Sequence, residues 1–277
     1  MKKIDLNNNT VIPMIGFGTY LLQGEDCYNA TKEAIKIGYR MIDTAEGYGN
    51  EKEVGLAIKD SNIDRKELFI TTKVHFKSYE KTKEVVYNSL KNLQTDYLDL
   101  VLLHWPFGNY YKARRDLEDL YKEGKIKAIG ISNFEPNQFI DLIHFNKVIP
   151  VINQIEMHLY NQRVDERKYM EKYNIQPMAY APLGQGRINE IFTLDEVKEI
   201  ANKYNKTTTQ VLLRFLTQKN VIIIPRSKSV NHIKENFELF DFTLTDEEMN
   251  ILTNLDKKLV LMGNPQSPEK VEKAINW

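Results

Sequence analysis

Short apolar runs recur along the chain, and the stretches between them carry helical spacing. Several runs are apolar at consecutive positions, as parallel strands buried on both faces are. Between two of the runs, Ala30, Ala34 and Ile37 form an apolar stripe of the kind that one face of a helix presents to a core. The pattern therefore predicts alternating strands and helices. The eight predicted strands begin near Met14, Met41, Leu68, Tyr97, Ile126, Val151, Gln176 and Val221.

The ends of several predicted elements are also marked. Gly38 and Gly124 come just after helical segments, where the chain often turns left-handed and favours glycine. Thr193 followed by Glu196 matches a capping box at the start of a helix. At the N-terminus, residues 3–13 alternate apolar and polar positions around an asparagine-rich turn. This segment predicts a β-hairpin that could close the floor of a barrel.

The spacing of the predicted strands points to a fold class. They follow one another at intervals close to one β/α unit of about 30 residues, and the interval widens before the last strand, where two helices fit. Eight such units predict an α/β fold of the closed (β/α)8 type, a TIM barrel with an N-terminal β-hairpin and extra C-terminal helices. Periodicity alone leaves open an open, doubly wound sheet. A barrel can reach 277 residues as one unit, so residues 1–277 are expected to form a single domain.

Charge and composition narrow the classes of partner. The chain has 38 Lys and Arg against 38 Asp and Glu, so no net charge favours nucleic acid or an anionic membrane. No apolar run approaches the roughly 18 residues that span a bilayer. The expected partner is a small molecule, and the expected assembly is a monomer or a weak homo-oligomer. Cys27 is the only cysteine, which excludes an intrachain disulfide and favours a reducing compartment, so we expect the cytoplasm.

Polar side chains able to do chemistry follow the predicted strands. In a barrel the carboxyl ends of all strands meet at one face, which is where barrel enzymes have their active sites. Residues far apart in the sequence are therefore expected to form one site. In order from the second strand to the eighth, these residues are Asp43 and Tyr48, Lys73, His104, Ser132 and Asn133, Gln154, Tyr180, and Arg226.

Four of these residues suit proton transfer to a carbonyl group. A free phenol has a pKa of about 10, so Tyr48 needs a neighbour that favours its ionised form if it is to release a proton near neutral pH. The charge of Lys73 could favour that form, and Asp43 would keep the lysine charged in a closed site. His104 could donate a hydrogen bond to the carbonyl oxygen. Together the four describe carbonyl reduction without a metal.

Carbonyl reduction also requires a hydride donor, which no side chain supplies, so a nicotinamide cofactor is expected. The glycines at positions 16, 18 and 24 lack the G-x-G-x-x-G spacing of the dinucleotide-binding fingerprint, so a Rossmann dehydrogenase is not favoured. The five histidines show neither H-x-H nor H-E-x-x-H spacing, so no metal site is expected.

The catalytic candidates have plainer interpretations as well. Tyr48 is one of 15 tyrosines and could be a packing residue, and His104 could be a hydrogen-bonded core histidine. Lys73 at a strand end could instead form a Schiff base with a carbonyl substrate, as in an aldolase-type lyase. Cys27, on a predicted helix, is expected to serve packing.

The aromatic and basic candidates also have both a structural and a functional interpretation. Tyr20, Phe76 and Trp105 could simply be core, but their positions beside site residues favour an apolar wall for the substrate. Arg226 and Lys228 could be surface charges at a helix start. Residues 185–187 form either a loop that closes over the cofactor or an ordinary turn.

The stretches around these residues occur in an order that is typical of one family. They are 43–51 (DTAEGYGNE), 71–73 (TTK), 103–106 (LHWP), 124–126 (GKI), 132–134 (SNF), 153–156 (NQIE) and 181–184 (APLG). Single motifs are weak, but the ordered set resembles the aldo-keto reductase superfamily from the first strand to Asn236. Within it, the likeness is to the bacterial diketogluconate reductase-like, small-aldehyde reductase branch.

This resemblance implies an NADPH-dependent oxidoreductase that passes hydride from the nicotinamide to an aldehyde or ketone. It implies that Tyr48 is the proton donor, tuned by Asp43 and Lys73, and that His104 orients the carbonyl. The residues that it implies for the cofactor are Ser132, Asn133 and Gln154 at the carboxamide, Tyr180 against the nicotinamide ring, Leu183 under the pyrophosphate, Arg226 and Ser227 at the 2′-phosphate, and Glu235 and Asn236 at the adenine. Those expected to contact substrate are His104, Tyr20, His75 and Trp105.

The chain departs from the family pattern at several positions. His232 stands where many members have a second arginine near the 2′-phosphate, so the use of NADH beside NADPH is open. Arg226 replaces the commoner lysine. Tyr20 and His75 stand where tryptophan is frequent, and Leu159 where proline is usual. The substrate is therefore open among small aldehydes, α-dicarbonyls and keto-sugar acids.

Two further points follow from the resemblance. Residues 259–277 carry no motif, although in members of the family the C-terminal segment shapes the substrate pocket. A catalytically silent NADPH-binding module is a further alternative, because a fold can persist while its function shifts. The presence of all four candidate catalytic residues argues against that alternative.

Overall fold

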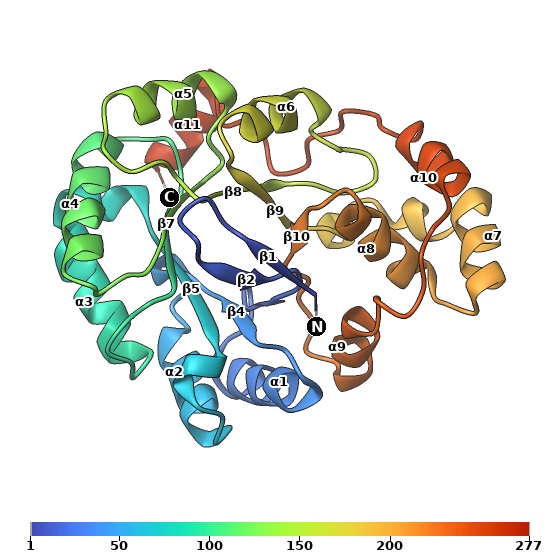
Figure 1. Cartoon of the computed structure of the whole chain (residues 1–277), viewed down its shortest axis with the longest axis horizontal. Coiled ribbons are helices and arrows are strands. Elements are labelled where there is room, and N and C mark those ends of the chain that lie inside the picture. The colour runs from blue at the N-terminus through green and yellow to red at the C-terminus, as the bar shows by residue number, and fades with distance from the viewer. Residues whose placement is uncertain (1, 277) are drawn as a thin grey trace.

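The computed structural model describes residues 2–276 and contains a closed barrel. Eight parallel strands follow one another in chain order within one sheet, with the helices outside it (Figure 1). The sheet closes because Ile15 bridges in parallel to Ile223 and the N–H of Gly16 donates to the carbonyl of Ile223 at 2.9 Å. The predicted (β/α)8 barrel is confirmed, and the open sheet is excluded. The strands are β3 (Phe17–Gly18), β4 (Met41–Asp43), β5 (Phe69–Val74), β6 (Leu100–Leu103), β7 (Ile129–Ser132), β8 (Ile152–Glu156), β9 (Gln176–Tyr180) and β10 (Ile222–Ile223).

The N-terminal hairpin covers the floor of the barrel. Its strands β1 (Lys3–Asp5) and β2 (Val11–Pro13) pair antiparallel, with Ile4 opposite Ile12. Leu6 and Ile12 are buried against side chains from the first residues of the barrel strands, which fill the lower interior. The predicted hairpin is confirmed. The residues that it packs against include Met41, Phe69, Leu100, Ala128, Val151, Ile152, Met178 and Ile222.

Helices surround the barrel, and α1 shows how an apolar face packs against it. On the first of them, the predicted stripe has Ala30 and Ala34 buried and Ile37 half-buried. Two α-helices lie between β9 and β10, as predicted, and within the described residues three follow β10, in line with the extra C-terminal helices expected. Over residues 2–276 no helix is long and apolar enough to cross a membrane. The helices are α1 (Gly24–Ile37), α2 (Glu51–Asp60), α3 (Thr82–Asn92), α4 (Tyr110–Lys122), α5 (Pro136–His144), α6 (Val164–Lys172), α7 (Asp195–Tyr204), α8 (Thr208–Gln218), α9 (Val230–Phe237), α10 (Asp246–Thr253) and α11 (Pro268–Ile275).

The predicted helix ends are partly confirmed. Gly38 (φ 129°) and Gly124 (φ 72°) both follow helices with a backbone that favours glycine. The capping box predicted from Thr193 and Glu196 is wrong. The hydroxyl of Thr193 instead donates to the carbonyl of Glu190 at 2.9 Å and closes a preceding 3-10 turn. As a result, α7 begins without a side-chain cap.

Candidate active site

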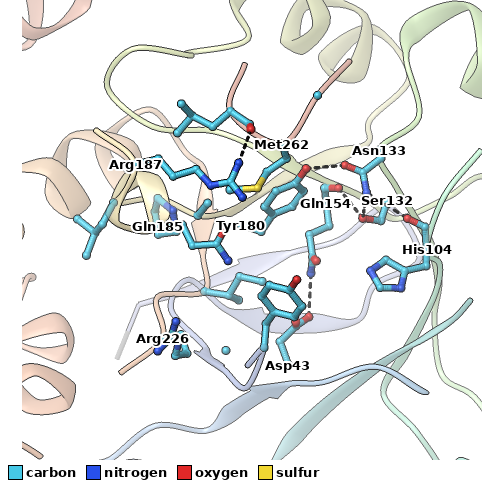
Figure 2. Close-up of a pocket in the computed structure, with 18 of the residues that line it drawn as sticks. Asp43, His104, Ser132, Asn133, Gln154, Tyr180, Gln185, Arg187, Arg226 and Met262 are labelled. Carbon is cyan, nitrogen blue, oxygen red and sulfur yellow. Dashed lines mark hydrogen bonds between the residues drawn. The ribbon is translucent and has the colours of Figure 1, made fainter. Parts of the chain in front are cut away.

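A cavity of about 1110 Å³ opens at the carboxyl ends of the barrel strands (Figure 2). The structure brings most of the predicted site residues to this one place. Lys73 lies behind the cavity wall, and Ser227, Glu235 and Asn236 are not among its described lining residues. The predicted residues that do line it are Tyr20, Asp43, Tyr48, His75, His104, Trp105, Ser132, Asn133, Gln154, Tyr180, Leu183 and Arg226.

The alternation of side chains along two strands explains how Asp43 and Lys73 meet. Residues an even number of positions apart share one side of a strand, so Asp43 follows Met41, and Lys73 follows Phe69, into the barrel interior. Because β4 and β5 are parallel neighbours, Nζ of Lys73 reaches Oδ1 of Asp43 at 2.5 Å and the carbonyl oxygen of Thr44 at 2.8 Å. The lysine side chain is 0% exposed and the aspartate side chain 2%.

Burial and pairing act in opposite directions on this ion pair. Burial raises the pKa of Asp43 and lowers the pKa of Lys73, because each charged form loses its water. Their mutual attraction opposes both shifts, and Nε2 of Gln154 donates a further hydrogen bond to Oδ2 of Asp43 at 2.8 Å. The carboxylate therefore holds a charge on a lysine that solvent does not reach.

Tyr48 ends a short 3-10 turn, η1 (Glu46–Tyr48), that follows β4. Nε2 of Gln23 donates to the carbonyl oxygen of Tyr48 at 2.7 Å and holds the end of the turn. The phenol ring lies 4.9 Å from Nζ of Lys73, measured to the ring centroid, and edge-on to His104 with ring centroids 5.8 Å apart. The hydroxyl-bearing ring thus lies between the buried lysine and the imidazole.

The direction of the Tyr48 pKa differs from the sequence-based expectation. Burial, followed by the charge of Asp43, raises the pKa of Tyr48 well above its ordinary value. The net shift is upward, opposite to the lowering that the charge of Lys73 was expected to produce, because burial disfavours the phenolate more than any neighbour favours it. The phenol therefore stays protonated at neutral pH. It is suited to act as an acid, and the lysine charge can stabilise the phenolate once the proton has left.

His104 is held as a neutral ring. Burial lowers its pKa well below the ordinary histidine value, and the charge of Lys73 adds to that effect. The carbonyl oxygen of His104 accepts a hydrogen bond from Nδ2 of Asn133 at 3.1 Å, which fixes the backbone. Nδ1 of the ring is buried and has no hydrogen-bond partner among residues 2–276. The ring can therefore hydrogen-bond a carbonyl oxygen without carrying a charge.

These pKa directions predict a flat acidic limb in the pH profile of kcat/KM. His104 should already be neutral, and Tyr48 still protonated, at the pH of about 6.5 where an ordinary histidine titrates. Rates measured from pH 5.5 to 8.5 should show no inflection there. His232→Gln, which removes an exposed histidine, is the control. The prediction is contradicted if an inflection persists in His232→Gln but vanishes in His104→Gln.

A chain of hydrogen bonds joins the strand ends along one side of the cavity (Figure 2). The hydroxyl of Tyr180 donates to Oδ1 of Asn133 at 2.7 Å, and Nδ2 of Asn133 donates to Oγ of Ser132 at 3.1 Å. The hydroxyl of Ser132 donates to the carbonyl oxygen of Gln154 at 2.8 Å, and the Gln154 amide donates to Asp43. Five side chains are therefore positioned as one unit. They come from β4, β7, β8 and β9 and from the loop that follows β7.

The opposite end of the cavity is basic and more exposed. Arg226 lines it from the loop after β10 and is exposed. Ser227 follows in the same loop, where its Oγ accepts a backbone hydrogen bond. Glu235 accepts a hydrogen bond from the hydroxyl of Thr207 at 2.6 Å, and Asn236 is buried on α9. The roles predicted for Ser227, Glu235 and Asn236 stay predictions.

Aromatic and imidazole rings form the wall around the reactive end. Tyr20, His75 and Trp105 line the cavity, as expected for residues that contact substrate. Phe76 is not among the described lining residues, and it packs behind His75 with ring centroids 4.4 Å apart. Phe76 therefore supports the wall through His75, and its interpretation as a wall residue stays a prediction. Leu159 is buried in the outer core.

Comparison with known proteins decides the family. The model of the Aldo/keto reductase family matches residues 14–257, which is most of the chain. The chain belongs to the aldo-keto reductase family. The family resemblance read from the ordered motifs is thereby confirmed.

Several members of the aldo-keto reductase family are similar over nearly the whole chain. The glyoxal reductase of Bacillus subtilis is 41% identical over 268 residues, covering 95% of this chain and 95% of that protein. The crystal structure of an aldo-keto reductase from a Medee basin deep-sea metagenome library is 43% identical with a TM-score of 0.93, covering 95% and 98%. The Bombyx mori aldo-keto reductase in complex with NADP is 31% identical with a TM-score of 0.88, covering 94% of each chain.

Sequence reasoning named no individual residues for part of the cavity wall of this aldo-keto reductase, although it expected the C-terminal segment to shape the substrate pocket and left open whether residues 185–187 close over the cofactor. Leu261, Met262 and Gly263 line the cavity, although residues 259–277 carry no motif. Trp277, the last residue of that segment, lies outside the described residues. Arg187 also lines the cavity. The sequence held one usable signal for this part of the wall. Glu156 belongs to the NQIE motif, but no role was assigned to it.

The described residues of the cavity wall include no group of metal ligands. Within the part of the chain that the structure describes, no group of three or more His, Cys, Asp or Glu residues is placed to hold a metal ion. Cys27 is a buried thiol on α1, as its packing interpretation predicted.

Proposed function

We propose that this aldo-keto reductase reduces aldehydes or ketones to alcohols with NADPH, and that Tyr48 donates the proton. The observation that carries the proposal is the buried Asp43–Lys73 ion pair next to the Tyr48 ring. The same ring also faces His104. The experiment that tests it is oxidation of NADPH, followed by absorbance, with a panel of carbonyl compounds. Absence of oxidation with every compound would reject it.

The lining residues fit a nicotinamide dinucleotide. The volume suits an extended ligand, and the amide and hydroxyl groups of Ser132, Asn133 and Gln154 suit the carboxamide. The ring of Tyr180 would lie against the nicotinamide and Leu183 under the pyrophosphate. At the basic end, Arg226 and Ser227 would hold the 2′-phosphate, and Glu235 and Asn236 the adenine. The bound cofactor supplies the hydride that no side chain can supply.

The side chains divide the remaining chemistry among them. The neutral ring of His104 donates a hydrogen bond to the carbonyl oxygen and favours negative charge there. Tyr48 gives its hydroxyl proton to the developing alkoxide. Nζ of Lys73, 4.9 Å from the centroid of the Tyr48 ring, stabilises the resulting phenolate, while Asp43 keeps the lysine charged.

The Schiff-base alternative finds one observation in its favour and stronger ones against it. Burial lowers the pKa of Lys73, as a nucleophilic lysine requires. However, its side chain is 0% exposed, and Asp43 and the Thr44 carbonyl engage its Nζ. A substrate carbon in the cavity has no access to that nitrogen, so we retain reduction.

Arg226 gives a test of the phosphate site. A guanidinium fork binds phosphate strongly, so Arg226→Ala should raise the KM for NADPH by about tenfold to a hundredfold and leave that for NADH nearly unchanged. Lys228→Ala is the matched control, because Lys228 pairs with Asp26 at 3.5 Å instead of lining the cavity. Equal changes in KM for both cofactors would contradict the assignment. His232 is exposed on α9, and His232→Arg should strengthen the preference for NADPH.

We further propose short aldehydes and α-dicarbonyls as substrates, supported by the likeness to a glyoxal reductase and by the compact wall of Tyr20, His75 and Trp105. Residues 1–277 would act as a single domain in the cytoplasm, as a monomer or weak homo-oligomer. The balanced charge supports a small-molecule partner in place of nucleic acid or membrane. Size-exclusion chromatography with light scattering tests the oligomeric state.

A further inference from the structure

The chain crosses the rim of the cavity between α10 and α11 as an irregular segment, residues 257–266, here called the C-terminal strap. Its residues Leu261, Met262 and Gly263 line the cavity. On the side of α10, the backbone N–H of Leu259 donates to the carbonyl oxygen of Tyr160 at 2.9 Å. The strap has no regular secondary structure of its own, so its position depends on what holds it.

Glu156, the last residue of β8, holds the strap at the point where it lines the cavity. Its Oε1 accepts the N–H of Leu261 at 2.7 Å, and its Oε2 accepts the N–H of Met262 at 2.8 Å. Nε2 of His158 lies 3.0 Å from the same Oε1. Glu156 is only 5% exposed and His158 is fully buried. Both carboxylate oxygens are therefore engaged by two consecutive peptide groups of the strap.

The carboxylate stays ionised in this position. Burial alone raises the pKa of Glu156, but the hydrogen bonds from His158, Leu261 and Met262 outweigh burial and lower it. Hydrogen bonds to a charged acceptor are stronger than those between neutral groups. Two of the hydrogen bonds to this buried charge come from the strap, so displacing the strap is costly, because it would leave His158 to satisfy the carboxylate alone.

The same two residues of the strap are held from their carbonyl side as well. Nη1 of Arg187 donates to the carbonyl oxygen of Leu261 at 2.8 Å (Figure 2), and Nζ of Lys270 donates to that of Met262 at 2.8 Å. Arg187 follows the loop that carries Leu183, which we assigned to the cofactor. Lys270 lies over the Trp105 ring, 4.7 Å from its centroid. The strap thus joins the loop at the cofactor to the wall at the substrate.

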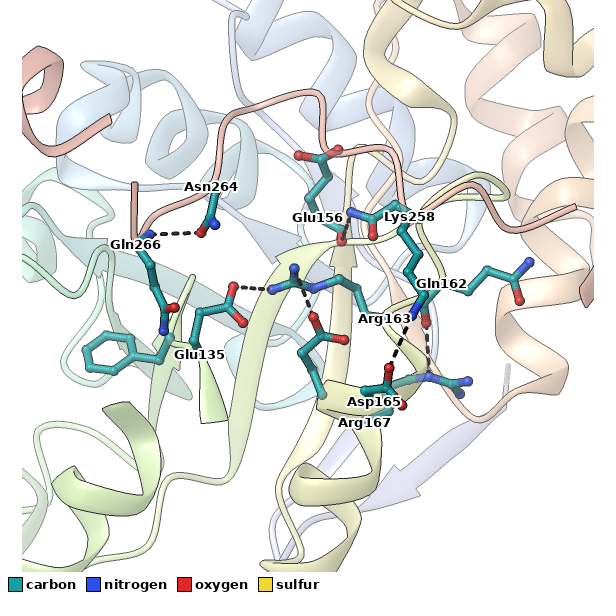
Figure 3. A network of polar contacts seen from close by, with 12 residues as sticks. Glu135, Glu156, Gln162, Arg163, Asp165, Arg167, Lys258, Asn264 and Gln266 are labelled. Atoms are coloured by element: carbon teal, nitrogen blue, oxygen red, sulfur yellow. Dashed lines mark hydrogen bonds and ion pairs between the residues drawn. The ribbon is translucent and has the colours of Figure 1, made fainter. Parts of the chain in front are cut away.

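The other polar contacts near the strap are peripheral. Lys258 pairs with Asp165 at 3.3 Å (Figure 3), and Nε2 of Gln266 donates to Oδ1 of Asn137 at 2.6 Å; both pairs are exposed. Exposed pairs of this kind contribute little to stability. Figure 3 shows Glu156 beneath the strap, on the inner side of this network.

We propose that Glu156 is a positioning residue for substrate binding, which locks the C-terminal strap as the outer wall of the pocket. It does not touch the reacting atoms, so its effect passes through Leu261 and Met262. The proposal rests on the proposed function, since it assigns the strap to the substrate pocket of a carbonyl reductase. It does not depend on which carbonyl compound is reduced.

The test is Glu156→Gln, a change of the same size that replaces one acceptor oxygen with an NH₂ group. With NADPH saturating and methylglyoxal as probe, KM for the carbonyl should rise about tenfold while kcat changes less than about threefold. Amide hydrogen exchange of residues 257–266 should accelerate by about tenfold, which a residue acting only on chemistry would not cause. Glu156→Asp, which keeps the charge but has a shorter reach, should give intermediate values of both.

Glu248→Gln is the matched control. Glu248 is also a buried glutamate, 6% exposed, and it accepts hydrogen bonds from Lys203 and Tyr204 away from the cavity. Its replacement should leave KM and the exchange of the strap unchanged. The proposal is overturned if Glu156→Gln leaves strap exchange and KM unchanged, or if Glu248→Gln reproduces both effects. If none of the carbonyl compounds causes the unaltered protein to oxidise NADPH, the proposed function fails. The exchange measurement still reports on the strap in that case.

Discussion

Tyr48→Phe should lower kcat for carbonyl reduction by about 10²- to 10⁴-fold, the range that a positioned general acid contributes. The phenylalanine keeps the ring between Lys73 and His104 and removes only the hydroxyl that carries the proton. Binding of NADPH should therefore change by less than about twofold. Steady-state rates and a fluorescence titration of NADPH measure the two effects separately.

Tyr28→Phe provides the control for this change. Tyr28 lies on α1 and its hydroxyl donates to Asp60 at 2.8 Å, so the same atom is removed away from the cavity. Its kcat should stay within about twofold of the unaltered protein. Near-normal turnover in Tyr48→Phe would reject Tyr48 as the proton donor.

Lys73→Met should abolish measurable turnover and also destabilise the fold. It leaves Asp43, 2% exposed, without its counter-ion, and breaking a buried pair in this way costs about 3–5 kcal/mol of unfolding free energy. Burial then raises the pKa of Asp43 further, because the opposing charge is gone. A carboxyl whose folded pKa is raised loses stability as pH rises, so the defect should be larger at pH 7 than at pH 5. Urea unfolding at both values measures it.

A double variant separates loss of charge balance from loss of packing. Asp43→Asn combined with Lys73→Met removes both charges, so it should recover part of the stability that Lys73→Met loses at pH 7. If the double variant is as unstable as the single one, the ion pair is not what stabilises this part of the barrel. Borohydride treatment with a carbonyl substrate should trap no adduct on Lys73, because its side chain is not exposed.

Sequence patterning predicted the fold and the gathering of the site for identifiable reasons. Consecutive apolar runs indicate strands buried on both sides. Their regular spacing indicates one helix between successive strands, and the wider interval before the last strand indicates two. Barrel topology then brings Asp43, Tyr48 and His104 to one face. Closure of the sheet through Ile15 and Ile223 involves residues more than two hundred positions apart, and periodicity does not encode it. The ordered motifs favoured the barrel where periodicity left the choice open.

Other features depend on tertiary contacts that local sequence does not report. Thr193 has the sequence of a cap, but the preceding turn engages its hydroxyl. The pKa of Tyr48 rises because burial and the charge of Asp43 both disfavour the phenolate. The strap carries no motif of its own, so the residues with which it lines the cavity, and their bonds to Glu156, become evident only in the structure.

The most direct test is the fate of the hydride. NADPH labelled with deuterium at C4 of the nicotinamide, on each face in turn, is oxidised with methylglyoxal, and the alcohol is analysed by mass spectrometry and NMR. If the protein is the carbonyl reductase proposed above, one of the two labelled forms transfers one deuterium to the carbon that was the carbonyl, in proportion to NADPH consumed. NADPH consumed without label at that carbon from either form, or no consumption with any carbonyl, would contradict it.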